Sequence, residues 1–415
     1  MSDLPGGDPL VAPFLGEHYA TLDRLVELLA PPYDVIAEPE RAALARRHPN
    51  NIVHLILPEG DGDPYHAAAQ RLERWRRDGV LVTEPSPAVY VVQQEFTIDG
   101  RGRVRTGLIA AVAAEPFEAG RIKPHERTHA GPKQDRLALL RSTRTMFEAL
   151  LMLSRDPGGE LAERLAQATE EAAPWATGSV RDVAVRAWRV AGPRAAELAA
   201  AAGRGALYIA DGHHRFETAA AFRREVPAAA RTLALVVPVR DPGLVVSPTH
   251  RIVRGRSLAD DVAAQLQAQC VIRPLSHDTD PQAALASLTP AGRGCVAVLP
   301  GSRLMALARR PDASPGPLVS FDPAVRGLDV TWADAYVVAA LRNATDGADV
   351  GYSADAAEVI AEVRFGRAQA GVLLNPPAVE DVLAVADAGG FMPQKSTYFL
   401  PKVPSGLVML SYDRA

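Results

Sequence analysis

The chain has 415 residues, of which 47% are apolar and 23% are charged. This composition is that of a folded globular protein with room for two or three domains, and it excludes a largely disordered chain. The 45 Lys and Arg residues and 49 Asp and Glu residues give a formal net charge of −4. The chain therefore lacks the overall positive field that draws proteins onto nucleic acid, and we expect no nucleic-acid partner.

The cysteine content and the hydropathy pattern indicate in which cellular compartment the protein is expected. Cys270 and Cys295 are the only cysteines and form no CxxC pattern, which fits a reducing compartment and excludes a cysteine-rich zinc module. The N-terminal stretch has no basic region followed by an apolar run, and no apolar stretch approaches the roughly 20 residues of a membrane helix. We expect a cytoplasmic protein with no signal peptide and no membrane partner.

In chain order, the sequence alternates helical and strand-like patterns. Helical spacing runs through 17–29, 133–152 and 159–173, and strand-like runs at 88–98 and 104–114 flank an Asp-Gly pair that is typical of an antiparallel hairpin. Further predicted elements are strands at 181–190, 231–239 and 244–253, a helix from Pro193, a strand-to-helix joint within 206–222, a helix at 257–270 and a hairpin at 294–309. Mixed strands and helices with an antiparallel hairpin predict an α+β fold, with mixed sheets and flanking helices.

The weakest patterning lies near 155–180 and 310–328. It predicts three segments: an N-terminal α+β region at 1–155, a core at 156–310, and a C-terminal segment at 311–415 that packs on the core.

Histidine is scarce in this chain, yet it clusters. Five of the ten histidines fall in RIKPHERTHAGPK (His125 and His129), DGHHR (His213 and His214) and SPTHR (His250). Each stretch also carries Arg or Lys, which scattered core histidines would not usually do. We expect at least two of these stretches to share a site.

HERTH matches the HExxH pattern of zinc proteases, which needs two histidines one helical turn apart. Pro124 before it and Gly131-Pro132 after it limit any helix here to under two turns. The flanking residues are charged rather than apolar. These features argue against a metalloprotease.

The stretch ALYIADGHHRFETAAAF, at 206–222, predicts an anion site where a strand enters a helix. The first N–H groups of a helix lack partners inside it, and the helix dipole adds partial positive charge there. Gly212 permits a close backbone approach, Arg215 can fork onto a phosphate, and His213 and His214 can donate hydrogen bonds. Asp211 could cap the helix, orient a histidine, hold Mg²⁺ or accept a proton. A capped helix with a solvated basic first turn is the alternative.

Three other stretches carry candidate residues. PPYDVI places Asp34 after a rigid double proline, KPHERT sits in a loop bracketed by proline and glycine, and FMPQKSTYFLPK groups cations with hydroxyls. No P-loop, dinucleotide fingerprint or nucleophile elbow is present. The candidates from these stretches and from SPTHR are Asp34, Lys123, His125, Glu126, Arg127, Thr249, His250, Arg251, Lys395, Ser396 and Thr397.

Five stretches, in order, resemble the markers of domain-of-unknown-function family 1015. They are PPYDVI, KPHERT, LYIADGHHRFETA, SPTHRIV and MPQKSTYFLPKVPSGLV, and the resemblance spans about residues 12–412. The joint also looks like the phosphate-binding turn of the ParB/sulfiredoxin-like fold, which implies such a core around DGHHR.

The free serine kinases of that superfamily phosphorylate L-serine from ADP or ATP with Mg²⁺. The resemblance implies that Asp211, Gly212, His213 and Arg215 lie at the phosphates, and that an acidic residue upstream, Asp34 or Glu126, is the general base. It implies a small hydroxylated amino acid as the second substrate. Asp211 is the candidate ligand for Mg²⁺.

The other cationic and hydroxyl-bearing candidates would then bind phosphate or the acceptor's carboxylate. Two alternatives remain at this point: a nucleotide-binding regulatory protein without turnover, and a metal-dependent hydrolase.

Overall fold

The computed structural model describes residues 8–60, 62–98, 100–128, 130–259, 261–276, 279–288, 294–310 and 316–413. The chain forms two compact units. Unit 1 contains the described residues up to Pro124, together with Thr128–Val245 and the residues from Pro401 on; unit 2 contains His125–Arg127 and Val246–Leu400. This division differs from the three predicted segments, because both ends of the chain contribute strands to unit 1. Each unit is described by itself.

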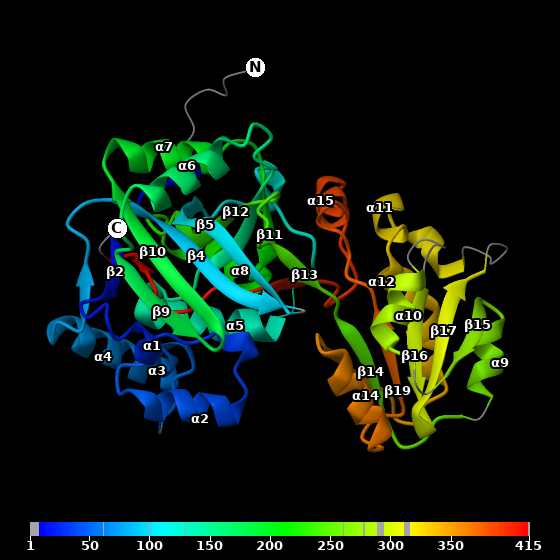
Figure 1. The fold of residues 1–415 in the computed structure, drawn as a ribbon. Helices are drawn as coiled ribbons and strands as arrows, with labels where there is room; N and C mark the ends of the chain where they lie inside the picture. Colours follow the sequence, from blue (N-terminus) through cyan, green and yellow to red (C-terminus); the bar gives the residue numbers. More distant parts are fainter. Residues whose placement is uncertain are drawn as a thin grey trace. The chain divides into compact units, whose positions relative to one another are not determined.

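Unit 1 is built on a mixed sheet of nine described strands (Figure 1). The order is β6 (Ile122–Lys123), β11 (Leu207–Asp211), β8 (Leu150–Ser154), β12 (Arg231–Pro238), β5 (Arg101–Ala113), β4 (Ala88–Ile98), β10 (Val183–Ala191) and β9 (Ala176–Val180), with β1 (Val11–Ala12) also pairing with β5. The pairs β11–β6 and β12–β8 are parallel, and β4–β5 is the predicted antiparallel hairpin. A smaller sheet in the order β3 (Leu81–Thr83), β2 (Gly16–Tyr19), β21 (Met409–Ser411) and β7 (Thr145–Met146) joins both ends of the chain.

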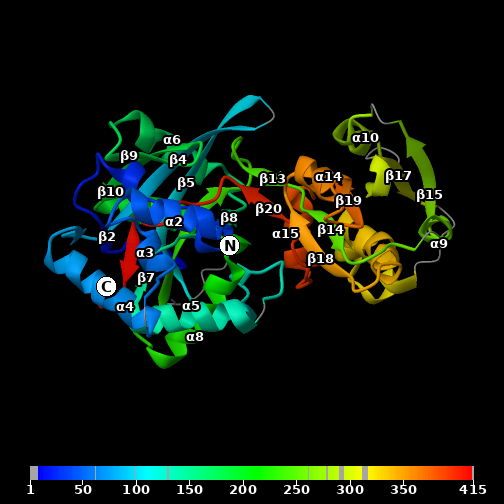
Figure 2. The same cartoon turned by 90° about the horizontal axis from the view of Figure 1, so that it is seen from below.

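Helices cover the large sheet of unit 1. α6 (Glu160–Glu170) and α7 (Pro193–Ala202) pack on one face, where Leu161 and Leu198 meet the central strands. α8 (His213–Glu225) packs on β8 and β12, and α5 (Ala130–Thr143) lies beside α8 (Figure 2). The remaining helices of unit 1 are α1 (Leu25–Leu28), α2 (Glu38–Arg47), α3 (Val53–Ile56), α4 (Pro64–Arg77) and the 3₁₀ turns η1 (Tyr33–Val35) and η2 (Phe117–Ala119).

Unit 2 has a sheet in the order β15 (Cys270–Leu275), β17 (Arg303–Arg309), β16 (Gly294–Leu299), β19 (Ala370–Leu374), β14 (His250–Arg254) and β18 (Asp349–Ser353). All its described pairings are antiparallel, and β16–β17 is the predicted hairpin. Helices α10 (Pro281–Leu288) and α14 (Ala356–Arg364) bury Leu285, Val359 and Val363 against it. The other elements are α9 (Val262–Gln267), α11 (Pro323–Arg326), α12 (Asp329–Trp332), a π-helical turn (Ala333–Val338), α13 (Ala339–Asn343), α15 (Val379–Asp387), the 3₁₀ turns η4 (Pro300–Ser302) and η5 (Gly316–Ser320), and the paired strands β13 (Val245–Ser247) and β20 (Tyr398–Leu400).

The predicted α+β class with mixed sheets and flanking helices is confirmed, but two helical predictions are wrong. Residues 16–19 form strand β2, where Glu17 is buried and pairs with Arg76, and the helix that follows is only α1. The helix predicted for 133–152 ends at Thr143, because Leu150–Ser154 form β8, which is buried along its whole length. A continuous apolar run suits a strand covered on both faces. Among the described residues, no helix combines the length and apolar character that a membrane crossing needs.

Candidate functional site

The DGHHR stretch forms the predicted joint between a strand and a helix. β11 ends at Asp211, Gly212 is the N-cap residue of α8, and His213 begins the helix. Gly212 has φ 93° and ψ 30°, a left-handed conformation that favours glycine. A Cβ atom here would lie 2.6 Å from Cδ2 of Leu150 and 3.0 Å from the Arg215 guanidinium. Both the backbone conformation and the packing therefore require glycine.

Asp211 faces two cations instead of capping the helix. Nη2 of Arg215 donates to Oδ2 of Asp211 at 2.8 Å, and Nζ of Lys402 donates to Oδ1. Gly212 occupies the N-cap position, so Asp211 is not the N-cap residue that the sequence allowed. Burial alone would raise the pKa of Asp211, but Lys402 and Arg215 outweigh it and hold this pKa well below its usual range. Asp211 is therefore ionised at neutral pH.

The polar network continues from Lys402 into the large sheet. The Lys402 carbonyl accepts a hydrogen bond from Nε2 of Gln94 at 2.9 Å, and Oε1 of Gln94 accepts from Arg105 on the neighbouring strand. Arg105 is fully buried; burial lowers its pKa to about 10, while Asp241 and Asp211 oppose that shift. A guanidinium with this pKa stays charged at neutral pH. The joint is thus tied to the middle of the sheet by buried hydrogen bonds.

Arg215 points inward from α8. Its Nη1 donates to the Ala149 carbonyl at 3.0 Å, and its side chain is buried. Burial alone would lower the pKa of Arg215, but three nearby carboxylates raise it: Glu148, Asp211 and Asp34. The predicted residue Asp34 therefore lies in the electrostatic surroundings of the joint.

Glu148 links the PPYDVI stretch to this region. Its Oε1 accepts a hydrogen bond from the Tyr33 backbone N–H at 2.9 Å and one from the Ser405 hydroxyl at 3.2 Å. The Arg136 guanidinium lies 4.1 Å from the Tyr33 ring centroid, a cation–π distance. Glu148 thus holds the residue that precedes Asp34.

The two histidines occupy the first turn of α8. His213 is buried and His214 is half-buried, and the His214 carbonyl accepts a hydrogen bond from the Thr218 hydroxyl at 2.8 Å. Lys123 lies on β6, directly beside Tyr208 of β11, with its Nζ 5.7 Å from the Tyr208 ring centroid. Unit 1 therefore contains Asp34 and Lys123 together with the whole DGHHR stretch.

The arrangement around Asp211 does not fit a magnesium ligand. Both of its oxygens face cations, so a metal would have to displace Lys402 or Arg215. In the described ranges of the chain, no group of three or more His, Cys, Asp or Glu residues could hold a metal ion. His129 of the HERTH stretch lies outside the described residues, and 124–128 are not helical.

The other predicted residues belong to unit 2, where two of the sequence motifs meet. Nε2 of His125 lies 3.0 Å from Oγ1 of Thr397, and the His125 carbonyl accepts a hydrogen bond from the Met392 N–H at 2.8 Å. The Arg127 guanidinium lies 5.2 Å from the Phe391 ring centroid. KPHERT and MPQKSTYF therefore contact each other.

Arg251 is the centre of unit 2's polar core. It makes a two-bond ion pair with Asp334 at 2.8 and 2.9 Å. It also donates to the carbonyls of Thr249 at 2.6 Å, Lys395 at 3.0 Å and Gln394 at 3.2 Å. These bonds use the whole guanidinium, so Arg251 holds the protein together here and offers no free fork to a phosphate.

The neighbours of Arg251 are also engaged internally. Nδ1 of His250 accepts the Leu374 N–H at 3.1 Å, and burial, aided by the Arg251 charge, lowers the His250 pKa to about 4. Ser396 donates its hydroxyl to the Pro393 carbonyl at 2.5 Å, and Lys395 has a left-handed φ of 53°. The Thr249 hydroxyl is buried and has no hydrogen-bond partner in the described part of the chain. His250 is therefore a neutral acceptor at physiological pH.

Glu126, the second candidate base, lies in the electrostatic surroundings of Tyr352 in unit 2. Burial is the main cause of a raised Tyr352 pKa, and Glu126 adds to that rise. Glu126 thus belongs to a different unit from the joint.

The sequence patterns did not relate four residues to the joint's network: Gln94, Arg105, Glu148 and Lys402. A role for Glu148 could have been predicted, because it is the only charged residue in the otherwise largely apolar run TMFEALLML. Lys402 lay within the quoted FLPK stretch, but nothing in its local sequence relates it to Asp211, 191 positions earlier.

Comparison with known proteins gives a family and a set of distant structural likenesses. The family model described as "Protein of unknown function (DUF1015)" matches residues 11–331. No curated protein matches the sequence.

Solved structures with some similarity include a conserved hypothetical protein from Pyrococcus furiosus, with 13% identity and a TM-score of 0.38 over 74% of this chain and 97% of that one. A free serine kinase in complex with AMP has 12% identity and a TM-score of 0.39, covering 72% of this chain and 92% of the kinase. TM-scores below 0.5 do not establish a shared fold, so these likenesses assign no function.

Proposed function

The chain belongs to the DUF1015 family, and from that premise we propose that it is a phosphotransferase moving a phosphoryl group from ADP or ATP to the hydroxyl of a small acceptor. Free L-serine is the acceptor that we favour, from the resemblance of the DGHHR stretch to the turn of the free serine kinases. The same joint would lie at the centre of a ParB/sulfiredoxin-like core.

The observation that carries this proposal is the geometry at Gly212. The left-handed Gly212 is the N-cap residue of α8, so a ligand can approach the backbone at this position without meeting an N-cap side chain. The first N–H groups of an α-helix have no partners within it, and the helix dipole favours an anion at that end. This combination supports phosphate binding at residues 212–214.

The side chains around the joint have distinct proposed roles. His213 and His214 donate hydrogen bonds to the charge on the transferring group, since positioning and electrostatics carry phosphoryl transfer. Arg215 and Lys402 act as positioning residues, because they hold the ionised Asp211 at the end of β11. Lys123, beside β11, is a further candidate for the phosphates.

In the proposed reaction, the acceptor oxygen forms a bond to phosphorus while the bond to the nucleotide breaks. The nucleotide leaves with one phosphate fewer, and the acceptor's proton passes to a carboxylate. We favour Asp34 for this base, because it lies in unit 1 and its charge influences Arg215 of the joint, while Glu126 remains the other candidate.

The direct test is turnover. Purified protein is incubated with ADP or ATP, Mg²⁺ and a panel of hydroxyl amino acids, and a phosphorylated product is sought by mass spectrometry. We expect O-phosphoserine, its loss in His213→Asn and His214→Asn, and its retention in a control at the exposed His66, His66→Gln. Absence of both nucleotide binding and turnover would contradict the proposal.

One observation favours a second function, nucleotide binding without turnover. Both oxygens of Asp211 are engaged by cations, which leaves this carboxylate poorly placed to accept a proton or a metal. Tight ADP binding with no product from any hydroxyl acceptor would select this regulatory alternative.

A further inference from the structure

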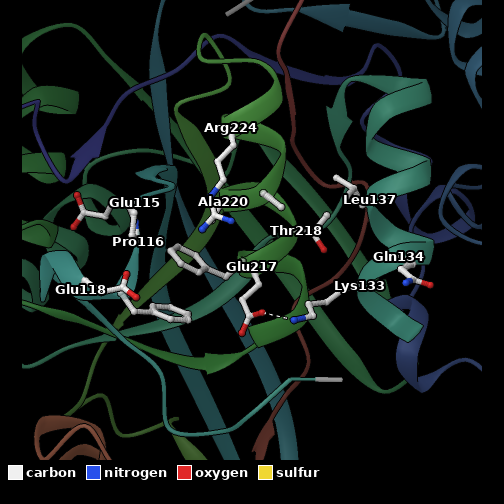
Figure 3. Close-up of a pocket in the computed structure, with 13 residues that line it drawn as sticks. Glu115, Pro116, Glu118, Lys133, Gln134, Leu137, Glu217, Thr218, Ala220 and Arg224 are labelled. Atoms are coloured by element: carbon white, nitrogen blue, oxygen red, sulfur yellow. Dashed lines mark hydrogen bonds and ion pairs between the residues drawn. The ribbon is translucent and has the colours of Figure 1, made fainter. Parts of the chain in front are cut away.

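A pocket of about 500 Å³ lies in unit 1 beside α8 (Figure 3). α8 forms its floor, the loop around η2 forms one wall, and α5 forms the other. A volume of this size is typical of sites for small organic molecules. Its lining includes Phe216, Glu217 and Thr218 from the end of the LYIADGHHRFETA motif, to which the sequence assigned no role.

The pocket follows the DGHHR joint along the same helix face. Glu217 lies one turn after His213, and Ala220 and Ala221 lie one turn further. At 1.5 Å per residue, the distance along the axis from His213 to Ala220 is about 10 Å. A phosphate bound at the start of α8 could therefore belong to a molecule whose body lies over Ala220 and Ala221.

The lining combines aromatic, small and charged side chains. The Phe117 and Phe216 rings stack, with centroids 5.2 Å apart and planes at 19°, and Phe117 is partly exposed. The small side chains of Ala220 and Ala221 leave the floor open. Lys133 on α5 and Glu217 on α8 form an ion pair at 2.7 Å within the lining (Figure 3).

We propose that this pocket holds the base and ribose of the nucleotide, with Phe117 as a stacking platform for the base. Ribose hydroxyls are commonly recognised by carboxylates, which Glu118 and Glu217 supply, and Lys133 adds a positive charge to the lining. The pocket is larger than a free serine needs, which favours the nucleotide as its occupant. This inference rests on the proposed phosphate site at residues 212–214.

The test separates the nucleoside from the phosphates. Binding of ADP and of inorganic pyrophosphate is measured by calorimetry for the full chain and for Ala221→Trp, in which an indole fills the pocket. The matched control is Ala200→Trp, at an exposed position of α7 that does not line the pocket. We expect Ala221→Trp to weaken ADP binding at least tenfold and to leave pyrophosphate binding unchanged, whereas the control Ala200→Trp should keep both affinities.

A second, milder variant guards against misfolding. Phe117→Leu keeps an apolar side chain but removes the aromatic face, and we expect about tenfold weaker ADP binding, within the range that base stacking contributes. ADP affinity that is unchanged in both variants, or pyrophosphate affinity that falls equally, would overturn the nucleoside site while leaving the phosphate site standing. If the unaltered protein binds neither ADP nor pyrophosphate, the proposed function itself fails, and the pocket assignment fails with it.

Discussion

Each unit contains a buried arginine paired with an aspartate, and the two pairs differ in what surrounds them. In unit 2, the N–H groups of the Arg251 guanidinium all donate hydrogen bonds, to Asp334 and to three backbone carbonyls. In unit 1, Asp211 faces a second cation, Lys402, and lies next to a left-handed glycine and a helix start. A pair whose donors are all used within the protein holds the fold, whereas a pair beside a glycine N-cap at a helix start can support ligand binding.

The largest expected effect tests the structural half of this comparison. Arg251→Ala removes five hydrogen bonds and leaves Asp334 without its partner, so we expect unit 2 to lose about 4 kcal/mol of stability. Hydrogen exchange in β14 and in 391–397 measures this loss. Arg254→Ala, which removes a more exposed ion pair with Glu362, is the control and should change exchange far less. Equal effects would break the comparison.

The pH dependence of unit 2 should come next in size. The folded pKa of His250 is about 4, below the ordinary value of about 6.5, so its stability contribution is complete above pH 6.5 and is lost as the pH falls toward 4. We expect the free energy of unfolding of unit 2 to fall by about 3 kcal/mol between pH 6.5 and pH 4, as measured by hydrogen exchange in β14 and β19. His250→Asn keeps an acceptor for the Leu374 N–H and should flatten the profile, whereas His66→Gln should not.

Gly212→Ala tests whether the joint is closely packed. Its Cβ would meet Leu150 and Arg215 in addition to adopting a positive φ, so we expect about 2–3 kcal/mol lower stability and loss of ADP binding. Gly159→Ala is the matched control, since Gly159 is a left-handed N-cap with nothing within 4 Å of its Cβ position. We expect that control to cost only about 1 kcal/mol and to bind ADP normally. Similar results for both would show that packing at the joint is unimportant.

Lys402→Met should have the smallest effect on stability, about 1–2 kcal/mol at neutral pH, because Arg215 still pairs with Asp211. Its signature is the pH profile. Asp211 has a folded pKa below its ordinary value of about 3.9, so its contribution is present above that value and is lost as the pH falls through the folded pKa. Removing Lys402 raises the Asp211 pKa, and the acid limb of a denaturation profile between pH 5 and 2 should become shallower. An unchanged limb would mean that Lys402 does not tune Asp211.

The sequence predicted the joint well because the joint is local. An apolar strand, a glycine and a helix follow one another within 206–222, and each carries its own pattern. The hairpins at β4–β5 and β16–β17 were predictable for the same reason.

The rest depended on distant contacts. The spacing of residues 17–29 predicts a helix, but pairing with β3 and β21 makes the start of this segment the strand β2. No local pattern relates Lys402 to Asp211. Nor does any local pattern indicate that Arg251 would donate all its hydrogen bonds to other groups of the protein. Residue type predicted charge in these cases, but only tertiary structure decided whether that charge faces a partner or a ligand.

The position of Lys402 in the chain has a consequence for biosynthesis. Unit 1 receives its last strand, β21, and its second cation at Asp211 only after all of unit 2 has been made. A nascent chain therefore carries an incomplete joint while the 191 positions from Asp211 to Lys402 are translated, and contacts across such long separations also slow folding. A ribosome that stops before residue 402 would release a chain with DGHHR but without the cation that completes its surroundings, so full-length synthesis would itself control when the joint matures.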